Sequence, residues 1–282
     1  MRNHLFICYF LILSATIINA QNIELYVSDG GNYNNPPWQI LKFDENGKNP
    51  EVFIKEHLAW PQDILFLEYQ GIVLISNLNT GKITKYDAKT GKYLGDFATG
   101  IGGTTRMKIG PDGLLYVLQW TGNGKVKRYK LDGTFVDDFT ETGVRQSIGL
   151  DWDSKGNLYV SSYNGNFIKK YSPKGKDLGN FIDKNTVGPT NIVFDKDENL
   201  LVLDYKDGSI KKFDIHGKYL GVFISGLKAP EGIDFYPNGN IVVGNGGTKS
   251  VKVYTSDGKF IKELVTPSLG GLILPNAVRL RK

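Results

Sequence analysis

The segments GLLYVLQ (113–119), GNLYVSS (156–162) and GNIVVGN (239–245) share one pattern: a Gly-led turn followed by alternating apolar residues. Related segments occur at 23–29, 71–77 and 198–204, which makes six copies in 282 residues. Alternating β-branched and aromatic residues are typical of strands, and Gly and Asn are typical of tight turns. Because self-similarity at a fixed period indicates a repeat architecture, the pattern predicts a β unit repeated six times.

Two further strands follow each copy at constant spacing. The first of them ends in an aromatic residue, and successive copies of that residue are 41 to 43 positions apart: Phe43, Tyr86, Tyr129, Tyr171, Phe213 and Tyr254. The last strand of each unit carries one large apolar residue near its end, namely Phe53, Phe97, Phe139, Phe181, Phe223 and Leu264.

The remaining strand of the unit shows how the ends of the chain meet. It occurs at 63–66, 106–109, 149–152, 191–194 and 232–235, and its sixth copy is PNAVRL at 275–280. We therefore predict an all-β fold: a six-bladed β-propeller of four-stranded blades over residues 21–282, closed by the C-terminal strand joining the N-terminal blade. Such closure removes the two open sheet edges.

Residues 1–20, MRNHLFICYFLILSATIINA, have the composition of a secretory signal peptide, with one basic residue, an apolar run and a small residue before the cleavage point. The alternative is a retained membrane anchor, but the apolar run from 5 to 18 is short for a bilayer core of about 30 Å. We expect a secreted or periplasmic protein with no membrane span in the mature chain, and Cys8, the one cysteine, is lost with the leader.

The charge pattern argues against a nucleic-acid partner, although the formal net charge is +5 and the pI is near 9.0. A basic protein that binds nucleic acid gathers its cations in a patch or stripe. Here one cation recurs in each of five units and is spread around the ring, at Lys42, Lys85, Arg128, Lys170 and Lys212. We expect a monomer whose partner is an extracellular glycan, small molecule or protein.

The units SIGLDWDSKGNLYVSSYNGNFIKKYSPKGKDLGNF (147–181) and PEGIDFYPNGNIVVGNGGTKSVKVYTSDGKFIKEL (230–264) resemble NHL repeats. NHL propellers neighbour two enzyme groups, the gluconolactonase/regucalcin-like lactonases and the streptogramin lyases. The resemblance covers nearly the whole mature chain and implies the propeller fold. It does not imply an activity, because the shared residues are turn and core residues.

In such a ring, the loops that enter the first strands and leave the second strands share one face. The opposite face carries the tight Gly turns, which we expect to be too short to form a pocket. The candidate ligand-binding residues therefore lie on the first face, around the axis and in the loop 30–39. They are Tyr33, Trp38, Asp63, Arg106, Trp120, Tyr163, Asn191, Tyr205 and Glu231. The alternative for the aromatic residues is packing against neighbouring blades.

Two functions remain open at this stage. The leading one is a binding module that uses this axial face. The other is a metal-dependent lactonase-like hydrolase or lyase, because the resemblance implies Ca²⁺ or Mg²⁺ at the channel mouth, held here by Glu231 and Asn276. Thr105, Ile148 and Thr190 stand at the matching positions of three other units and are poor ligands. His57, on a connecting loop, is the one candidate general base, and no catalytic residue is assigned.

Overall fold

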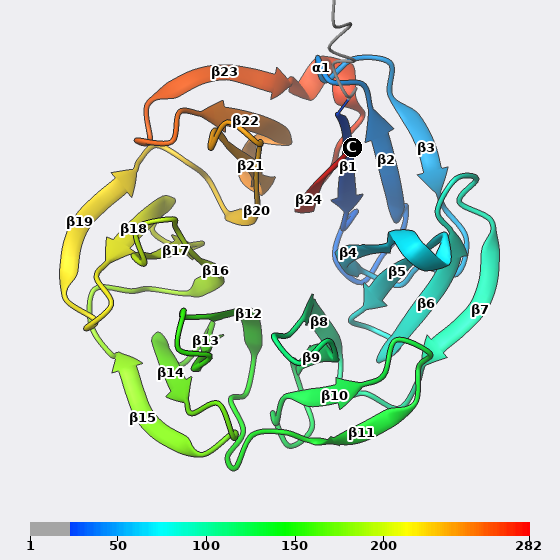
Figure 1. Cartoon of the computed structure of the whole chain (residues 1–282). Coiled ribbons are helices and arrows are strands. Elements are labelled where there is room, and N and C mark those ends of the chain that lie inside the picture. Colours follow the sequence, from blue (N-terminus) through cyan, green and yellow to red (C-terminus); the bar gives the residue numbers. More distant parts are fainter. Residues whose placement is uncertain (1–22) are drawn as a thin grey trace, which may run out of the picture.

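The computed structural model describes residues 23–282, so the predicted signal peptide at 1–20 lies outside the described residues. The 24 strands of this part of the chain form six four-stranded antiparallel sheets arranged as blades around a central axis (Figure 1). The all-β propeller predicted from the repeats is confirmed.

The strand order within each blade follows the chain, apart from the blade that joins both ends. Blade 1 contains β24 (Pro275–Arg281), β1 (Glu24–Asp29), β2 (Gln39–Phe43) and β3 (Glu51–Ile54). Blade 2 contains β4 (Pro61–Leu67), β5 (Ile72–Asn77), β6 (Lys82–Asp87) and β7 (Tyr93–Ala98), and blade 3 contains β8 (Thr104–Ile109), β9 (Leu115–Gln119), β10 (Lys127–Tyr129) and β11 (Phe135–Asp138).

The other three blades have the same layout. Blade 4 contains β12 (Ser147–Trp152), β13 (Leu158–Ser162), β14 (Phe167–Tyr171) and β15 (Asp177–Ile182). Blade 5 contains β16 (Pro189–Phe194), β17 (Leu200–Asp204), β18 (Ser209–Phe213) and β19 (Tyr219–Ile224), and blade 6 contains β20 (Pro230–Phe235), β21 (Ile241–Asn245), β22 (Ser250–Tyr254) and β23 (Phe260–Val265).

The ring closes through β24, as predicted. This C-terminal strand pairs antiparallel with β1, with Leu280 opposite Leu25 and Val278 opposite Val27. All four side chains face apolar surroundings, and Leu25, Val27 and Val278 are buried in the cluster between blades 6 and 1. The first and last described strands therefore share one sheet (Figure 1).

The core lies between the blades. Each of the six apolar clusters in residues 23–282 combines side chains of two neighbouring blades. Near the axis, buried hydroxyl groups of one blade donate hydrogen bonds to backbone carbonyl oxygens of the next. These bonds join Ser28 to Pro61 (2.7 Å), Ser76 to Thr105 (2.5 Å), Thr105 to Ser147 (2.7 Å), Ser161 to Thr190 (2.6 Å) and Thr190 to Pro230 (3.0 Å).

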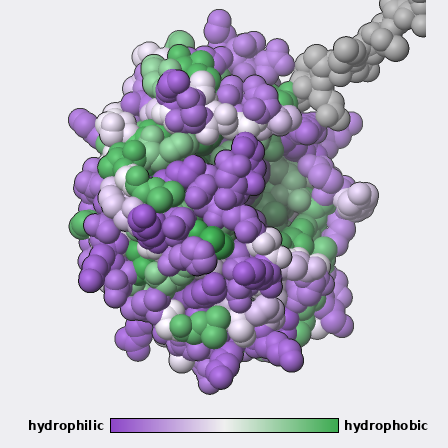
Figure 2. Space-filling model, turned by 60° about the vertical axis from the view of Figure 1, so that its left-hand side comes forward, coloured by the Kyte–Doolittle hydropathy of each residue, from purple (hydrophilic) through white to green (hydrophobic). Residues whose placement is uncertain are grey.

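The helical segments are short: η1 (Glu68–Gln70), η2 (Gly246–Thr248) and α1 (Pro267–Gly270). Within the described part of the chain, no helix has the length and apolar character needed to cross a membrane. Hydrophilic side chains cover most of the surface seen in Figure 2, and the hydrophobic ones there form small, separate patches.

Ending the chain at Leu274 removes β24, exposes one edge of β1 and uncovers Leu25 and Val27. Losing Val278 and Leu280 alone removes about 1.5–3 kcal/mol of burial per side chain. We expect the melting temperature to fall by roughly 10 °C or more, as measured by circular dichroism. Removal of Lys282 alone is the control, and an unchanged melting temperature in the longer truncation would contradict the role assigned to β24.

A candidate ligand site on the axial face

The loop between β1 and β2 reaches across the mouth of the axial channel. Tyr33, in this loop, presents its hydroxyl oxygen 3.4 Å from that of Tyr205 in blade 5, which is separated from blade 1 by blade 6. The Tyr33 ring also stands edge-on to the ring of Trp60, at a centroid distance of 5.2 Å. One loop residue therefore connects blade 5 with the loop that enters blade 2.

Aromatic contacts continue around the mouth from Tyr205. The Tyr163 ring lies 5.7 Å from the Tyr205 ring, and the Trp120 ring lies 5.9 Å from the Tyr163 ring. Edge-to-face and tilted pairs at such distances are favourable aromatic geometries. We call these five side chains the aromatic arc: Trp60, Tyr33, Tyr205, Tyr163 and Trp120. All five are partly exposed to solvent, and Tyr33 is the most exposed at 44%.

Two residues of the arc have an unusual backbone conformation. Tyr33 has φ of 51° and Trp60 has φ of 53°, in the left-handed region that bulky residues rarely adopt. Such conformations persist where the surrounding structure fixes them, and they are concentrated at functional sites. Trp38 supplies part of this support, because its indole N–H donates to the Tyr33 carbonyl oxygen at 2.9 Å.

Trp38 itself packs on the apolar cluster between blades 1 and 2 and does not join the arc. This matches the packing alternative for Trp38, whereas Tyr33 is presented to solvent. At the Trp120 end of the arc, a pocket of about 430 Å³ opens between Trp120, Thr121, Gly122, Arg145 and Gln146. The Lys206 ammonium lies 4.7 Å above the Tyr163 ring and adds a cation to this face.

A buried guanidinium occupies the axis beneath the arc. Arg106 is only 3% exposed, and its Nη2 donates to the carbonyl oxygens of Glu231 (3.2 Å) and Asn276 (3.1 Å) and to Glu231 Oε1 (3.3 Å). Within residues 23–282, its Nε and Nη1 have no hydrogen-bond acceptor. The axial centre of the ring therefore holds a positive charge facing one carboxylate.

Gln62 links this charged layer to the arc. In the amide orientation that satisfies its neighbours, its Nε2 donates to Glu231 Oε1 (3.2 Å), and its Oε1 accepts from Trp60 Nε1 (2.8 Å) and Asn276 Nδ2 (2.9 Å). Trp60 belongs to the arc but is not among the residues predicted from the sequence. The sequence does contain a signal for it, because Trp60 directly precedes Pro61, where the chain enters a first strand on the axial face.

Glu231 and Asn276 come together as the lactonase resemblance implies, but their surroundings do not fit a resident Ca²⁺ or Mg²⁺. Such ions need several oxygen ligands. Here the Arg106 guanidinium already faces the Glu231 carboxylate, and Asn276 Nδ2 donates to the Pro61 carbonyl oxygen (3.3 Å). Over residues 23–282, no group of three or more His, Cys, Asp or Glu residues could hold a metal ion.

The other two axial candidates lie further along the channel. Asp63, Asn191 and Arg106 line a cavity of about 230 Å³. Asp63 is buried and accepts a backbone N–H from Met107 (2.8 Å), which joins blades 2 and 3, while Asn191 accepts its neighbour's N–H (3.0 Å). Apart from Trp38, the predicted residues thus fall into a partly exposed aromatic layer and a polar layer in which Asp63, Arg106 and Glu231 are buried and Asn191 is half-buried.

His57 does not approach the channel mouth. Its ring stacks on that of Tyr93 at a centroid distance of 3.8 Å, and Tyr93 belongs to β7, the outermost strand of blade 2. This position gives His57 no contact with the arc or with Arg106.

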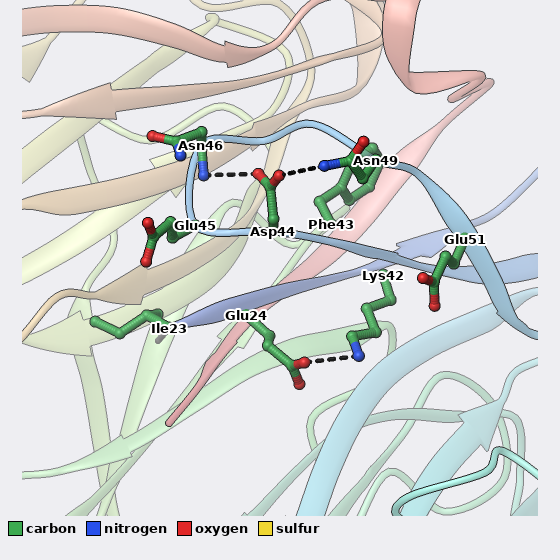
Figure 3. A pocket seen from close by; sticks show the side chains of 9 residues that line it. All are labelled: Ile23, Glu24, Lys42, Phe43, Asp44, Glu45, Asn46, Asn49 and Glu51. Atoms are coloured by element: carbon green, nitrogen blue, oxygen red, sulfur yellow. Dashed lines mark hydrogen bonds and ion pairs between the residues drawn. The ribbon is translucent and has the colours of Figure 1, made fainter. Parts of the chain in front are cut away.

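The expectation that the turn face forms no pocket is wrong. One pocket of about 270 Å³ lies at the β2–β3 turn (Figure 3), where Lys42 pairs with Glu24 and Asp44 accepts from Asn46 and Asn49. A second, of about 460 Å³, lies between blades 5 and 6. Turn length alone does not determine whether a pocket forms on this face, because the size of the side chains between blades also determines where hollows form.

Burial raises the pKa of the Glu231 carboxyl, with attraction to Arg106 opposing this shift and repulsion from Asp63 adding to it. Burial also raises the pKa of the Tyr205 and Tyr163 phenols, and the hydrogen bond with Tyr33 raises that of Tyr205 further. The raised pKa keeps the Tyr205 and Tyr163 phenols neutral at physiological pH, so both can donate hydrogen bonds.

Comparisons with known proteins support the fold alone. No family model matches the chain, and no curated protein matches it. Among solved structures, a Bacteroides caccae protein of unknown function has a TM-score of 0.73 and 16% identity, covering 93% of this chain and 99% of its own.

Two further solved structures are similar. A chain of a nidogen/laminin complex has a TM-score of 0.74 and 15% identity, covering 92% of this chain and 98% of its own. A candidate gluconolactonase has a TM-score of 0.64 and 18% identity, covering 75% of this chain and 79% of its own. The protein therefore has a six-bladed propeller fold with a gluconolactonase-like neighbour.

The raised pKa of Glu231 predicts a pH-dependent stability. Above the ordinary value of 4.5 the unfolded chain releases this proton first, so stability falls as pH rises from there to the folded-state pKa. Each pKa unit corresponds to about 1.4 kcal/mol. In urea unfolding between pH 4 and 7, Glu231→Gln should therefore gain stability relative to the wild type as pH rises. Glu45→Gln, in an exposed turn, controls for the lost charge, and a pH-independent difference would refute the raised pKa.

Proposed function

We propose that the protein is an exported binding module whose aromatic arc holds the rings of an extracellular glycan. The observation that carries the proposal is the arc itself: five contacting, partly exposed aromatic rings around the channel mouth. The apolar faces of sugar rings stack on aromatic side chains, and nearby phenol hydroxyls and the Lys206 ammonium can bind sugar hydroxyls.

Several features support a binding role at this face. Trp38 holds the Tyr33 loop from below, and Gln62 holds the Trp60 indole, so the rings are positioned before a ligand arrives. Such preorganisation lowers the entropy cost of binding. Export rests on the predicted signal peptide at 1–20 and places the protein in the periplasm or outside the cell, where N-terminal sequencing of the exported protein tests cleavage after Ala20.

A protein ligand is the second candidate for the same face. The observation that favours it is the similarity to a chain of a nidogen/laminin complex, since that propeller fold occurs in a complex between proteins. Aromatic residues are also enriched in the central contacts of protein interfaces. A glycan array and a pull-down with the intact protein distinguish the two ligands.

The glycan proposal predicts that the arc residues control affinity. Tyr205→Ala and Trp120→Ala should each weaken binding of the best array hit by roughly tenfold or more, because each removes a stacking ring. Isothermal titration calorimetry measures this loss. Tyr69→Ala is a matched control, since Tyr69 is fully exposed in the η1 turn on the opposite face. Array binding that is unchanged in both arc variants would refute the proposal.

The alternative function, a metal-dependent lactonase-like hydrolase or lyase, has the gluconolactonase-like fold in its favour. It requires a divalent ion at Glu231, which the Arg106 guanidinium disfavours. We expect millimolar Ca²⁺ or Mn²⁺ to leave the melting temperature unchanged within about 1 °C, because a specifically bound ion would stabilise the folded state. A clear upward shift that Glu231→Gln abolishes would support the enzyme.

A further inference from the structure

Blade 4 buries a tyrosine in an aromatic slot that opens toward the turn face. The ring of Tyr159 lies edge-to-face between those of Phe181 (4.7 Å) and Phe194 (4.9 Å). Its hydroxyl donates to Asp153 Oδ2 at 3.0 Å, and the Lys170 ammonium lies 5.0 Å above its ring. The slot thus provides two aromatic walls, a carboxylate acceptor and a cation for one phenol.

The same packing of a tyrosine between two aromatic walls occurs in two other blades, so it is a property of the repeat, whereas the carboxylate that accepts from the hydroxyl stands at a different position in each. In blade 1, the Tyr26 ring lies 5.1 Å from Phe53 and 4.9 Å from Phe66, and its hydroxyl donates to Glu24 (2.9 Å). In blade 3, the Tyr116 ring lies between Phe139 (5.1 Å) and Trp152 (5.0 Å), and its hydroxyl donates to Asp112 (3.0 Å).

Blade 5 keeps the slot but lacks the tyrosine. Leu201 stands 42 residues after Tyr159, at the same strand position. The two walls are present as Phe223 and Phe235, and the polar pair is present as Asp195 and Lys212. Lys212 Nζ lies 2.8 Å from Asp195 Oδ2 and 5.3 Å above the Phe223 ring.

The two remaining blades show that this combination is specific to blade 5. In blade 2, Leu74 stands in place of the tyrosine. The wall positions there hold Phe97 and Ile109, so one wall is aliphatic. In blade 6, Val242 is accompanied by Leu264 and Leu280 at the wall positions. Only blade 5 joins two aromatic walls to a small aliphatic residue between them.

The space left in blade 5 is a pocket of about 460 Å³, within the range of small-molecule sites. Leu201, Phe223, Phe235, Asp195 and Lys212 all line it. Its outer part is formed by the turns of blades 5 and 6, including Lys196, Asp197, Pro237, Asn238 and Ser256.

We propose that this pocket binds a small phenol, whose ring lies between Phe223 and Phe235, outward of Leu201, as the Tyr159 ring lies between its walls in blade 4, and whose hydroxyl donates to Asp195. The site is on the face opposite the aromatic arc and is independent of the glycan proposal.

The carboxylate is arranged to receive this hydroxyl. In blade 4, Asp153 Oδ1 accepts the backbone N–H groups of Lys155 and Asn157, which leaves Oδ2 to accept from Tyr159. In blade 5, Asp195 Oδ1 likewise accepts the backbone N–H groups of Asp197 and Asn199, both at 2.9 Å. Asp195 Oδ2 receives Lys212 and the Asn199 side chain (3.3 Å), as Asp153 Oδ2 receives Lys170 and Asn157.

Two further features define the ligand. Although burial opposes ionisation, the hydrogen bonds from Lys212 and Asn199 lower the pKa of Asp195, so it is an ionised acceptor at neutral pH. Leu201 is 1% exposed and closes the inner end of the slot. A ring whose hydroxyl reaches Asp195 therefore points its para position at Leu201, which excludes a long para substituent such as that of a tyrosyl residue.

The test is a titration of the intact protein with phenol, followed by ligand-observed NMR, with anisole as the comparison ligand. Anisole keeps the ring but cannot donate a hydrogen bond, and we expect it to bind at least about fivefold more weakly because a bond to a charged acceptor is lost. Asp195→Asn keeps Oδ1 for the turn and should weaken phenol binding by a similar factor. Leu201→Tyr should fill the slot with the chain's own phenol, abolish binding and raise the melting temperature.

Each outcome bears on the proposal. Equal affinity for phenol and anisole, or phenol binding that survives in a folded Leu201→Tyr protein, overturns it, and the first comparison needs no variant. N-acetyltyrosinamide binding as tightly as phenol would also overturn it, because a tyrosyl side chain of a partner protein would then be the ligand. Leu74→Tyr in blade 2, where one wall is aliphatic, is the matched control and should leave phenol binding unchanged.

Discussion

The pairing of β24 with β1 is the interaction on which the rest of the molecule depends, because it turns a row of blades into a ring. Its position is fixed by a buried carboxylate: Asp29, at the end of β1, accepts backbone N–H groups from Ile273 (3.0 Å), Leu274 (2.7 Å) and Gly31 (3.2 Å). One side chain therefore orients both the strand that closes the ring and the loop that carries Tyr33. The geometry of the aromatic arc is in this way a consequence of closure.

The axis of the ring is the second constraint. The six first strands surround it, and Arg106 of blade 3 extends into it to contact blades 6 and 1. A buried guanidinium is costly unless its charge is paired and its donors are used. The Glu231 carboxylate and two backbone carbonyl oxygens meet that need in part, so the axial face has a central cation of its own.

The fold could be predicted from the sequence because the repeat depends on local features of the chain. Turn residues and apolar periodicity recur every 41 to 43 residues, and the sixth first strand is visible at 275–280. It was insufficient for the site because the decisive contacts join distant residues. Tyr33 meets Tyr205 across 172 positions and Arg106 meets Glu231 across 125, and no periodic pattern encodes either pair. Trp38 and Tyr33 stand in the same short loop, yet the one packs inward and the other lies at the surface, which depends on the backbone path at Tyr33.

The turn-face pocket shows how a rigid repeat can acquire a site without longer loops. Replacing a buried tyrosine by leucine within a packed layer leaves a cavity, and an enclosed cavity costs stability in proportion to its volume. Between blades 5 and 6 the cavity lies at the surface, so water reaches its polar end at Asp195 and Lys212, whose side chains remain 15% and 25% exposed. The two phenylalanine walls are held by the same frame as in blade 4, and their apolar faces lose the ring that would cover them. The slot is therefore preorganised for an aromatic group at little cost in folding. The three tyrosine-filled copies in the same chain define the shape that such a group must match, and the copy in blade 4 defines its hydrogen bond.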